Sequence, residues 1–229
     1  MKWISDLIDL IFPRHCCVCG EVLSRTEKDM CLNCLYSLPK VEEIHRNEIE
    51  KIFWGKIDIE SATSYIYYRK SSPYNNLFHM AKYRNRPEVA ERLARLAAEE
   101  LEASGFFDGI DAIVPLPLSK KKRRKRGYNQ CDYIAAGLSQ ATGIPVLNDC
   151  VKRTRANETQ THKSREERWK NVEGIFTLAS PEPVQGKHIL LIDDILTTGA
   201  TLTSCAATMQ QEGNCRISIF TLGYTYNGI

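Results

Sequence analysis

The sequence lacks a long hydrophobic run. None of its 229 residues lies in a stretch that approaches the roughly 20 consecutive apolar residues of a membrane-spanning helix. The apolar segment Met1–Phe12 is interrupted by Asp6 and Asp9, and no small-residue cleavage site follows it, which argues against a secretion signal. Its spacing instead predicts an amphipathic helix lying on the protein. We therefore expect a protein without a membrane span, located in the cytoplasm.

Two common phosphate-binding loops are also missing. The chain contains neither Gly-x-x-x-x-Gly-Lys-Ser/Thr nor Gly-x-Gly-x-x-Gly, which excludes P-loop nucleotide hydrolases and the usual dinucleotide-binding fold. No internal repeat is evident, which excludes a solenoid. With 43% hydrophobic and 26% charged residues, the composition is that of an ordinary globular protein. The length fits one domain with a small addition, or two modest domains.

The nine cysteines are an odd number, so they do not form a complete disulfide framework. Four of them, Cys16, Cys19, Cys31 and Cys34, make the pattern Cys-x2-Cys-x11-Cys-x2-Cys. Two such pairs supply four thiolates for a tetrahedral Zn²⁺ site, and Gly20 follows the first pair where a knuckle commonly needs a positive φ. Four protein ligands leave no position for water, so we expect a structural zinc in a module spanning residues 1–38.

Neighbouring side chains leave some ambiguity in the ligand set. Cys17 is a possible substitute ligand, whereas His15 is better interpreted as a surface histidine. A segment this short cannot build its own core, so the metal would supply much of its folding free energy. The cysteines outside the pattern are interpreted as buried or incidental thiols: Cys17, Cys131, Cys150, Cys205 and Cys215.

The most informative segment lies near the C-terminus. Ile189–Ile192 reads as a buried strand of a parallel sheet and leads directly into Asp193 and Asp194. A small, hydroxyl-rich turn follows at 197–201, and a helix is predicted from there to about Gly213. Backbone N–H groups at a helix N-terminus favour a phosphate dianion, and a glycine permits its close approach. The two carboxylates can accept hydrogen bonds from vicinal sugar hydroxyls, so the segment suits a sugar phosphate.

Strands and helices alternate over the rest of the chain, which predicts a parallel sheet flanked by helices, with ligands beyond the carboxyl ends of its strands. We expect a linker at 39–56 and one α/β domain at 57–229. The polar stretch 152–171 has no sustained period and could fold over the site as a lid. The predicted strands are 61–68, 110–114, 144–147, 175–176 and 216–222, and the predicted helices are 75–83, one beginning near Pro87, and one ending near Gln140.

Positive charge is concentrated in one place. Seven of the 31 Lys and Arg residues occupy 120–126, which leaves 24 basic residues against 28 acidic ones elsewhere. Such a run has three interpretations: a solvated loop, electrostatic assistance to a phosphate site, or contact with nucleic acid. The only aromatic residue close in sequence is Tyr128, so nucleic-acid binding would be directed at the backbone and sensitive to salt.

The segment from Ile189 to Thr201 resembles the PRPP-binding motif of type I phosphoribosyltransferases. Together with the other motifs, it is similar to the ComF family, known from competence for DNA uptake and including the GntX-like proteins. The matching segments occur in the same order here: the cysteine pairs, Val-Pro-Leu-Pro at 114–117, Arg-Gly-Tyr-Asn-Gln at 126–130, the arginine-rich stretch that begins with Arg-x-Arg at Arg153, and the PRPP motif.

The resemblance implies a type I phosphoribosyltransferase-like fold that binds PRPP with Mg²⁺. It implies that Asp193 and Asp194 contact the ribose hydroxyls, and that the loop at Thr197, Thr198, Gly199, Ala200 and Thr201 binds the 5-phosphate. A pyrophosphate loop is implied at 116–119, where Leu116, Ser119, Lys120 and Arg126 are candidate residues. The implied lid residues are Arg155, Gln160 and either Arg165 or Arg168.

Two functions follow from these patterns. The first is Mg²⁺-dependent glycosyl transfer from PRPP, with Asp193 and Asp194 as catalytic residues, to an acceptor that no residue identifies. The second is a non-catalytic, PRPP-responsive protein that handles DNA, contacting single-stranded DNA or a helicase-like partner through the zinc module and the basic run. No general base is evident, because His79 and His162 are better explained as solvated side chains.

Overall fold

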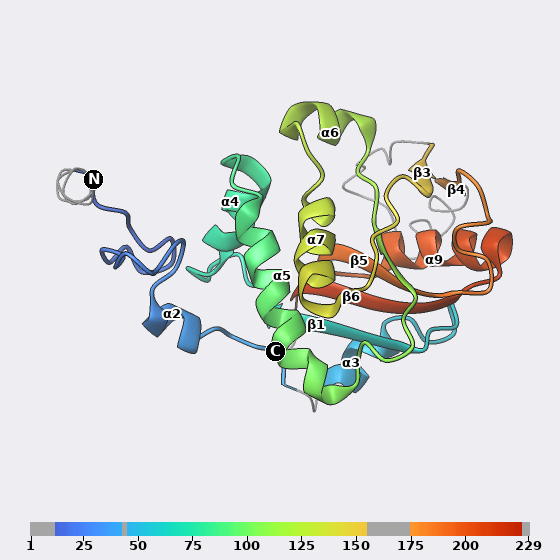
Figure 1. Cartoon of the computed structure of the whole chain (residues 1–229), viewed down its shortest axis with the longest axis horizontal. Helices are drawn as coiled ribbons and strands as arrows, with labels where there is room; N and C mark the ends of the chain where they lie inside the picture. Colours follow the sequence, from blue (N-terminus) through green and yellow to red (C-terminus); the bar gives the residue numbers. More distant parts are fainter. Residues whose placement is uncertain (1–11, 43–44, 155–174, 226–229) are drawn as a thin grey trace.

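A four-stranded parallel sheet forms the centre of the molecule. The computed structural model describes residues 12–42, 45–154 and 175–225. The sheet contains β1 (Ser61–Tyr67), β2 (Ala112–Pro115), β5 (His188–Leu196) and β6 (Arg216–Tyr224), in the order β1-β6-β5-β2 (Figure 1). Every neighbouring pair of these strands is parallel. The predicted α/β class and the parallel sheet are confirmed.

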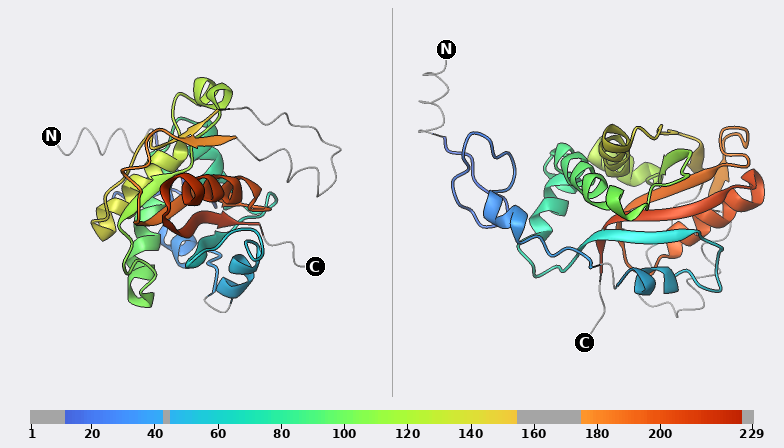
Figure 2. Two further views of the ribbon diagram at one scale, coloured as in Figure 1. Left: turned by 90° about the vertical axis from the view of Figure 1, so that its right-hand side faces the viewer. Right: turned by 60° about the horizontal axis from the view of Figure 1, so that its bottom comes forward.

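Helices cover both faces of the sheet because its central strands are apolar on both sides. Side chains of β5 alternate: Ile189 and Leu191 belong to one core cluster, and Leu190 and Ile192 to the other. The first face is covered by α3 (Arg46–Lys51) and α9 (Ala200–Gly213). The other is covered by α4 (Asn75–Tyr83), α5 (Glu88–Leu101) and α7 (Gln130–Thr142), as Figure 2 shows.

Most predicted elements are present with small changes at their ends. The apolar stripe of α5 is buried as expected, at Ala90, Leu93, Ala94 and Ala97. A short antiparallel pair, β3 (Val151–Arg153) and β4 (Phe176–Leu178), was predicted only in its second strand. The expected strand at 144–147 is reduced to a single bridge between Ile113 and Val146. Among the described residues, no helix has both the length and the apolar character needed to cross a bilayer.

The segment expected as a linker is partly structured. Helix α3 lies within 39–56, and its residue Ile49, together with Phe53 just after it, is fully buried in the core. Ile49, Ile52 and Phe53 recur at helical spacing, so the charged residues between them hid a short amphipathic helix. The part of the predicted linker from Arg46 to Phe53 is therefore a helical segment that packs on the core. The domain boundaries at 38 and 57 stay predictions.

The basic run is also helical and not a loop. It forms α6 (Lys120–Arg126), in which Ser119 caps the N-terminus by accepting a hydrogen bond from the Lys122 N–H at 3.4 Å. Gly127 ends the helix with φ +82°, a conformation that glycine adopts without strain. Lys120 to Lys125 are exposed to solvent. The interpretation as a solvated segment holds, but in helical form.

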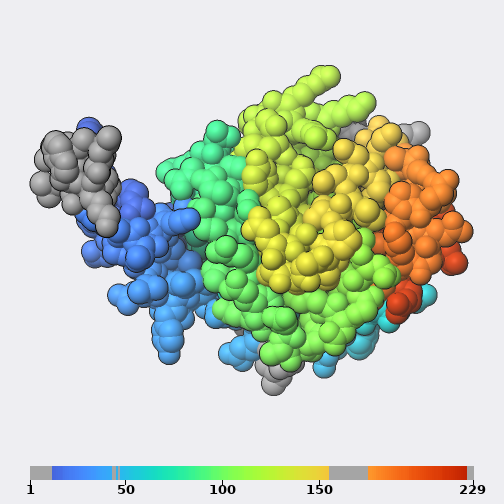
Figure 3. All heavy atoms as spheres, in the orientation of Figure 1, coloured from blue at the N-terminus to red at the C-terminus, as the bar shows by residue number. Residues whose placement is uncertain are grey.

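The N-terminal module lies at one end of the molecule and is attached to α4 and α5 (Figure 3). The module contains α2 (Leu32–Tyr36). Elsewhere, a 3-10 turn (Glu102–Ser104) follows the C-terminal end of α5. The Tyr74 hydroxyl donates to the carbonyl oxygens of Cys34 and Ser37 at 3.0 and 2.9 Å, and the Asn76 amide donates to Cys17 O at 2.9 Å. The amphipathic helix predicted at 1–12 lies outside the described residues except for Phe12.

Candidate functional site

Asp193 and Asp194 lie in the carboxyl-terminal part of β5, where the topology predicts a ligand site. Asp193 Oδ1 accepts hydrogen bonds from the Asp194 N–H at 2.8 Å and from the Cys131 thiol at 3.5 Å. Burial of this carboxyl group, and secondarily the neighbouring Asp194 charge, raises the pKa of Asp193 to about 7. The site therefore contains an acid whose protonation changes near neutral pH.

Asp194 is held by two side chains from different helices. Its Oδ2 atom lies 2.6 Å from Lys82 Nζ on α4 and accepts a hydrogen bond from the Gln130 amide of α7 at 2.8 Å. The Asp194 and Lys82 side chains are only 13% and 16% exposed, so solvent screens this ion pair weakly. The second carboxylate oxygen has no partner among the described residues, which leaves it available to a sugar hydroxyl.

Lys82 is a site residue that the sequence analysis did not identify. It follows Phe78 by four residues, and Leu77, Phe78 and Ala81 are the buried residues of α4. Lys82 therefore lies on the apolar side of an amphipathic helix, where an unpaired lysine would be costly. A lysine on the apolar side of a predicted helix was the feature of the sequence that could have identified Lys82. The helical pattern did not show which acidic residue would pair with its charge.

The threonine loop joins β5 to α9, and its one glycine, Gly199, is buried. Gly199 has φ +72° and occupies the N-cap of α9, while Thr197 and Thr198 are exposed. A Cβ atom on Gly199 would lie 2.8 Å from Ile52 Cγ2 and 3.0 Å from Phe53 Cε1. No side chain caps α9, so its first N–H groups remain available to an anion. The geometry fits the phosphate seat expected at 197–201.

Arg-Gly-Tyr-Asn-Gln at 126–130 connects this site to the neighbouring elements. Gln130, which contacts Asp194, accepts a hydrogen bond from Arg126 NH1 through its side-chain oxygen at 2.5 Å. The Tyr128 hydroxyl donates to Ala81 O at 2.7 Å, one residue before Lys82. The motif therefore fixes α4 and α7 around the acidic pair.

Asn129 connects the start of α7 to the segment that follows β2. Its side-chain oxygen accepts from the Cys131 N–H at 3.3 Å and so caps α7, while its amide donates to Leu116 O at 3.1 Å. Leu116 lies in the predicted pyrophosphate loop and is itself buried, so its backbone and not its side chain faces a polar partner. Ser119 is committed to capping α6, and Lys120 is exposed at the first position of that helix.

The predicted lid residues cannot be placed. Arg155, Gln160, Arg165 and Arg168 lie outside the described residues. Arg153, just before them on β3, is partly buried with its guanidinium 5.4 Å from the centre of the Phe176 ring. Burial lowers the pKa of Arg153, while the Asp193 charge opposes this effect. The Asp193 charge thus acts on Arg153, the first arginine of the arginine-rich stretch that the family resemblance identified.

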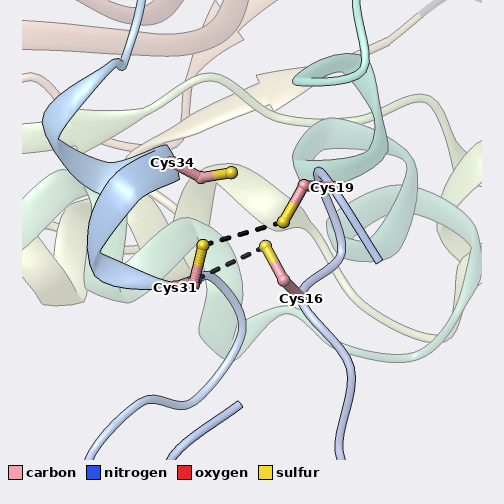
Figure 4. A group of neighbouring side chains, drawn as sticks. All are labelled: Cys16, Cys19, Cys31 and Cys34. Atoms are coloured by element: carbon pink, nitrogen blue, oxygen red, sulfur yellow. Dashed lines mark hydrogen bonds between the residues drawn. The ribbon is translucent and has the colours of Figure 1, made fainter. Parts of the chain in front are cut away.

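The four predicted zinc ligands converge at one point. The Sγ atoms of Cys16, Cys19, Cys31 and Cys34 all lie within 4.8 Å of one another (Figure 4). Gly20 has the expected positive φ, +81°, and its N–H donates to Cys16 O at 2.9 Å. Four thiolates arranged in this way fit a tetrahedral Zn²⁺ ion of the structural kind.

The two alternative ligands do not join this group. Cys17 is not part of the four-sulfur cluster and packs beside the core cluster that includes α4 and α5, where burial raises the pKa of its thiol to about 12. The His15 ring lies with Nδ1 2.9 Å from Gly20 O and is exposed. The four-sulfur cluster therefore consists of the cysteines that the spacing predicts, without Cys17 or His15.

The chain matches the model of the "Phosphoribosyl transferase domain" over residues 79–225. It is 30% identical to Competence protein F of Haemophilus influenzae over 215 residues, which covers 92% of this chain and 84% of that protein. It is 33% identical to DNA utilization protein YhgH of Salmonella typhi over 153 residues, or 66% of the length of each, just under two thirds of that relative.

Solved structures with a similar fold include a glutamine phosphoribosylpyrophosphate amidotransferase from B. subtilis, with TM-score 0.42, 19% identity, and coverage of 62% of this chain and 30% of that one. Adenine phosphoribosyltransferase from Saccharomyces cerevisiae gives TM-score 0.40, 16% identity, and coverage of 62% and 72%. Family membership rests on the sequence matches. The chain belongs to the phosphoribosyl transferase domain family, in the branch that contains Competence protein F.

Proposed function

We propose that the protein binds PRPP with Mg²⁺ and transfers its phosphoribosyl group to an acceptor that remains to be identified. One observation carries this proposal: two carboxylates at the end of a buried strand are followed within five residues by a positive-φ glycine at an uncapped helix N-terminus. This arrangement provides acceptors for vicinal hydroxyls next to donors for a phosphate, as a ribose 5-phosphate requires.

The residues of the chain suggest how the reaction proceeds. The N–H groups of α9 and the hydroxyls of Thr197 and Thr198 bind the 5-phosphate, and Asp193 and Asp194 accept hydrogen bonds from the ribose hydroxyls. When the C1–pyrophosphate bond breaks, its electron pair leaves with pyrophosphate and positive charge develops on the ribose ring. The acidic pair stabilises that charge, and Asp194, already fixed by Gln130 and Lys82, does so without reorganising. The lone pair of the acceptor then forms the new bond to C1.

Mg²⁺ would neutralise charge on the leaving pyrophosphate. Among the described residues, the four cysteines are the only group of three or more ligating side chains, so the acidic pair does not by itself form a complete magnesium site. Mg²⁺ prefers several oxygen ligands, including waters and substrate phosphates. The donor set therefore fits an ion bound mainly by PRPP and water, and Asp193 and Asp194 would be the protein residues that hold it.

Pyrophosphate release from Mg²⁺–PRPP, measured against a panel of purine, pyrimidine and other nucleophilic acceptors, tests this proposal. Release above the level of Asp193→Asn with at least one acceptor supports a transferase. Calorimetric titration with Mg²⁺–PRPP is the second measurement. No heat of binding to folded, zinc-containing protein would overturn the proposal entirely.

A second function is favoured by α6. This helix carries seven consecutive cations, and the one ion pair found for it within the described residues joins Arg123 to Asp149 at 4.0 Å. Binding of PRPP without turnover, combined with binding of DNA or of a helicase-like partner, would use the same acidic pair and this basic surface. Background-level pyrophosphate release with every acceptor, together with salt-dependent DNA binding, would favour this function over glycosyl transfer.

A further inference from the structure

Lys82 makes the only ion pair with Asp193 or Asp194 among the described residues. Its Nζ atom lies 2.6 Å from Asp194 Oδ2, and both side chains are largely buried. The same charge reaches the other acid, because burial raises the pKa of Asp193 and Lys82 opposes that rise. One lysine thus offsets negative charge on both residues that a divalent cation would use, in a place where solvent screens charges weakly.

The backbone on either side of Lys82 is fixed by contacts from the segment 126–130. The Tyr128 hydroxyl donates to the carbonyl oxygen of Ala81 at 2.7 Å, one residue before the lysine. The Arg126 guanidinium lies 5.2 Å from the centre of the Tyr83 ring, one residue after it. Helices α4 and α7, at the two ends of these contacts, cover the same face of the sheet (Figure 2). The lysine charge is therefore held at the acids by the fold.

The side chains that contact Asp194 occupy only one of its carboxylate oxygens. Lys82 and the Gln130 amide both approach Oδ2, while Oδ1 has no partner among the described residues. A divalent cation on this carboxylate would still meet the Lys82 charge at close range. Mg²⁺ is usually bound by one or two carboxylates together with water and substrate phosphates. Without such phosphates, the acidic pair with its lysine offers a divalent cation little net negative charge.

We propose that Lys82 is a built-in counter-ion that keeps divalent cations off the acidic pair until PRPP supplies the remaining metal ligands. The lysine thereby sets the order of binding, because the metal alone binds weakly and the metal with PRPP binds well. It also spares the unliganded protein two unpaired buried carboxylates, which would be destabilising. The counter-ion role rests on the proposed function, since the cation concerned is the one expected with PRPP.

Binding of Mn²⁺ to the full-length, zinc-containing protein without PRPP tests this role. Electron paramagnetic resonance measures free Mn²⁺ directly and requires no turnover. Mn²⁺ takes oxygen ligands as Mg²⁺ does, whereas the thiolates of the module favour zinc. The variant is Lys82→Met, which keeps the apolar stem and removes the charge. Its matched control is Arg84→Met, which removes an exposed charge two residues further along the chain.

Lys82→Met should bind Mn²⁺ at least about tenfold more tightly than the wild type, because one neighbouring charge changes the proton affinity of a carboxylate by about 10- to 1,000-fold. Arg84→Met and the charge-conserving Lys82→Arg should bind Mn²⁺ as weakly as the wild type. The gain should disappear in Lys82→Met/Asp194→Asn, which lacks the carboxylate that the lysine covers.

Thermal melts keep the test decisive if the variant is unstable. Lys82→Met leaves a buried carboxylate unpaired and should melt below the wild type in the absence of metal. Mn²⁺ alone should raise its melting temperature but not that of the wild type, because only the variant binds the ion tightly when folded. Lys82→Gln, whose amide can still donate to Asp194, is the second variant and should respond to Mn²⁺ in the same way.

Equal Mn²⁺ affinity in the wild type and in both uncharged Lys82 variants would overturn the counter-ion role. An equal gain in Arg84→Met would also overturn it, because net charge alone would then explain the effect. Calorimetry of the wild type with Mg²⁺–PRPP separates this result from the proposed function. No heat with PRPP, together with tighter Mn²⁺ binding by Lys82→Met, would keep Lys82 as the counter-ion and contradict the transferase. Binding of PRPP with unchanged Mn²⁺ affinity would do the reverse.

Discussion

Single residues set the protonation behaviour of the site. The pKa of Asp193 is raised to about 7, first by burial and second by the Asp194 charge, whereas an unfolded chain ionises this group near 3.8. Between these values the folded protein binds more protons than the unfolded one at this position. The contribution of Asp193 to the free energy of unfolding is therefore greatest at low pH and declines as pH rises from about 4 to 7.

Asp193→Asn should remove this dependence. We expect the free energy of unfolding of the wild type to fall relative to that of the variant by about 1 kcal/mol or more between pH 5 and pH 7.5, because each pKa unit corresponds to about 1.4 kcal/mol. Urea titrations of both proteins at the two pH values measure this change in the free energy of unfolding. Subtracting one protein from the other removes the contributions of titrating groups that both contain. A constant difference between the proteins would show that Asp193 ionises normally.

Gly199 is where backbone conformation and packing both require glycine. Gly199→Ala places a Cβ 2.8 Å from Ile52 on a residue with φ +72°, so we expect a loss of about 2–3 kcal/mol in unfolding free energy and weaker PRPP binding. The matched control is Gly186→Ala, which has φ +67° but nothing within 4 Å of the new atom. Denaturant unfolding should show about 1 kcal/mol for the control. Equal losses would mean that the contact with Ile52, just after α3, is unimportant.

At the scale of elements, strong local patterns were sufficient for prediction. The apolar run at 189–192 and the stripe along α5 identify their strand and helix because burial acts on many adjacent residues at once. Helix α3 was missed because Ile49 is its only apolar side chain, and Ile52 and Phe53 just after it add too few to outweigh the surrounding charges. The helical state of α6 depends on Ser119 and Gly127 at its ends. The prediction rested on the charges of the basic run and overlooked these two caps.

The site was predictable only where its residues are consecutive. Asp193, Asp194 and the threonine loop form one segment of sequence, as do the residues of each cysteine pair. Lys82 and Gln130 reach Asp194 from two other elements, and such proximity is a property of the fold. The same holds for Tyr83, which lies beneath Arg126 although 43 positions separate them in the chain.

The N-terminal module is the element whose folding should depend most on a bound metal. Among its described residues the buried four-sulfur cluster contains only Cys16, Leu23, Cys31 and Cys34, so there is almost no apolar core to replace a lost ion. Cys31→Ser should abolish binding of one zinc per chain and unfold this module while the parallel sheet stays folded. Elemental analysis and hydrogen exchange measure the two effects. Cys17→Ser is the control and should keep its zinc; loss of zinc from it would move the ligand set.

The whole molecule joins two sites through the same pair of helices. Helix α4 presents Lys82 to the acidic pair, and it also carries Tyr74 and Asn76, which hydrogen-bond to the backbone of the N-terminal module. Helix α5 contacts the module through Arg92 and packs extensively on α7, which carries Gln130. A change in the N-terminal module can therefore alter the position of Lys82 through α4 and α5.

This connection leads to a prediction about ligand-induced stability. Mg²⁺–PRPP at 100 times its Kd should raise the unfolding free energy of the sheet domain by about 2.7 kcal/mol, because it binds only the folded state. Asp194→Asn should reduce this gain at the same PRPP concentration, while the Asn oxygen still accepts from Gln130 and Lys82, so the unliganded domain should lose less than the about 3–5 kcal/mol that removing one partner of a buried ion pair costs.

Zinc removal provides the comparison at the scale of the molecule. Because the module holds α4 through Tyr74 and Asn76, the Cys31→Ser protein should bind Mg²⁺–PRPP more weakly although it retains Asp194, the threonine loop and the whole sheet. Thermal melts of the wild type and both variants, with and without ligand, measure the effect. An unchanged stabilisation by PRPP in Cys31→Ser would show that α4 keeps Lys82 in place without the module. The two sites would then contact the same helices but would not be energetically coupled.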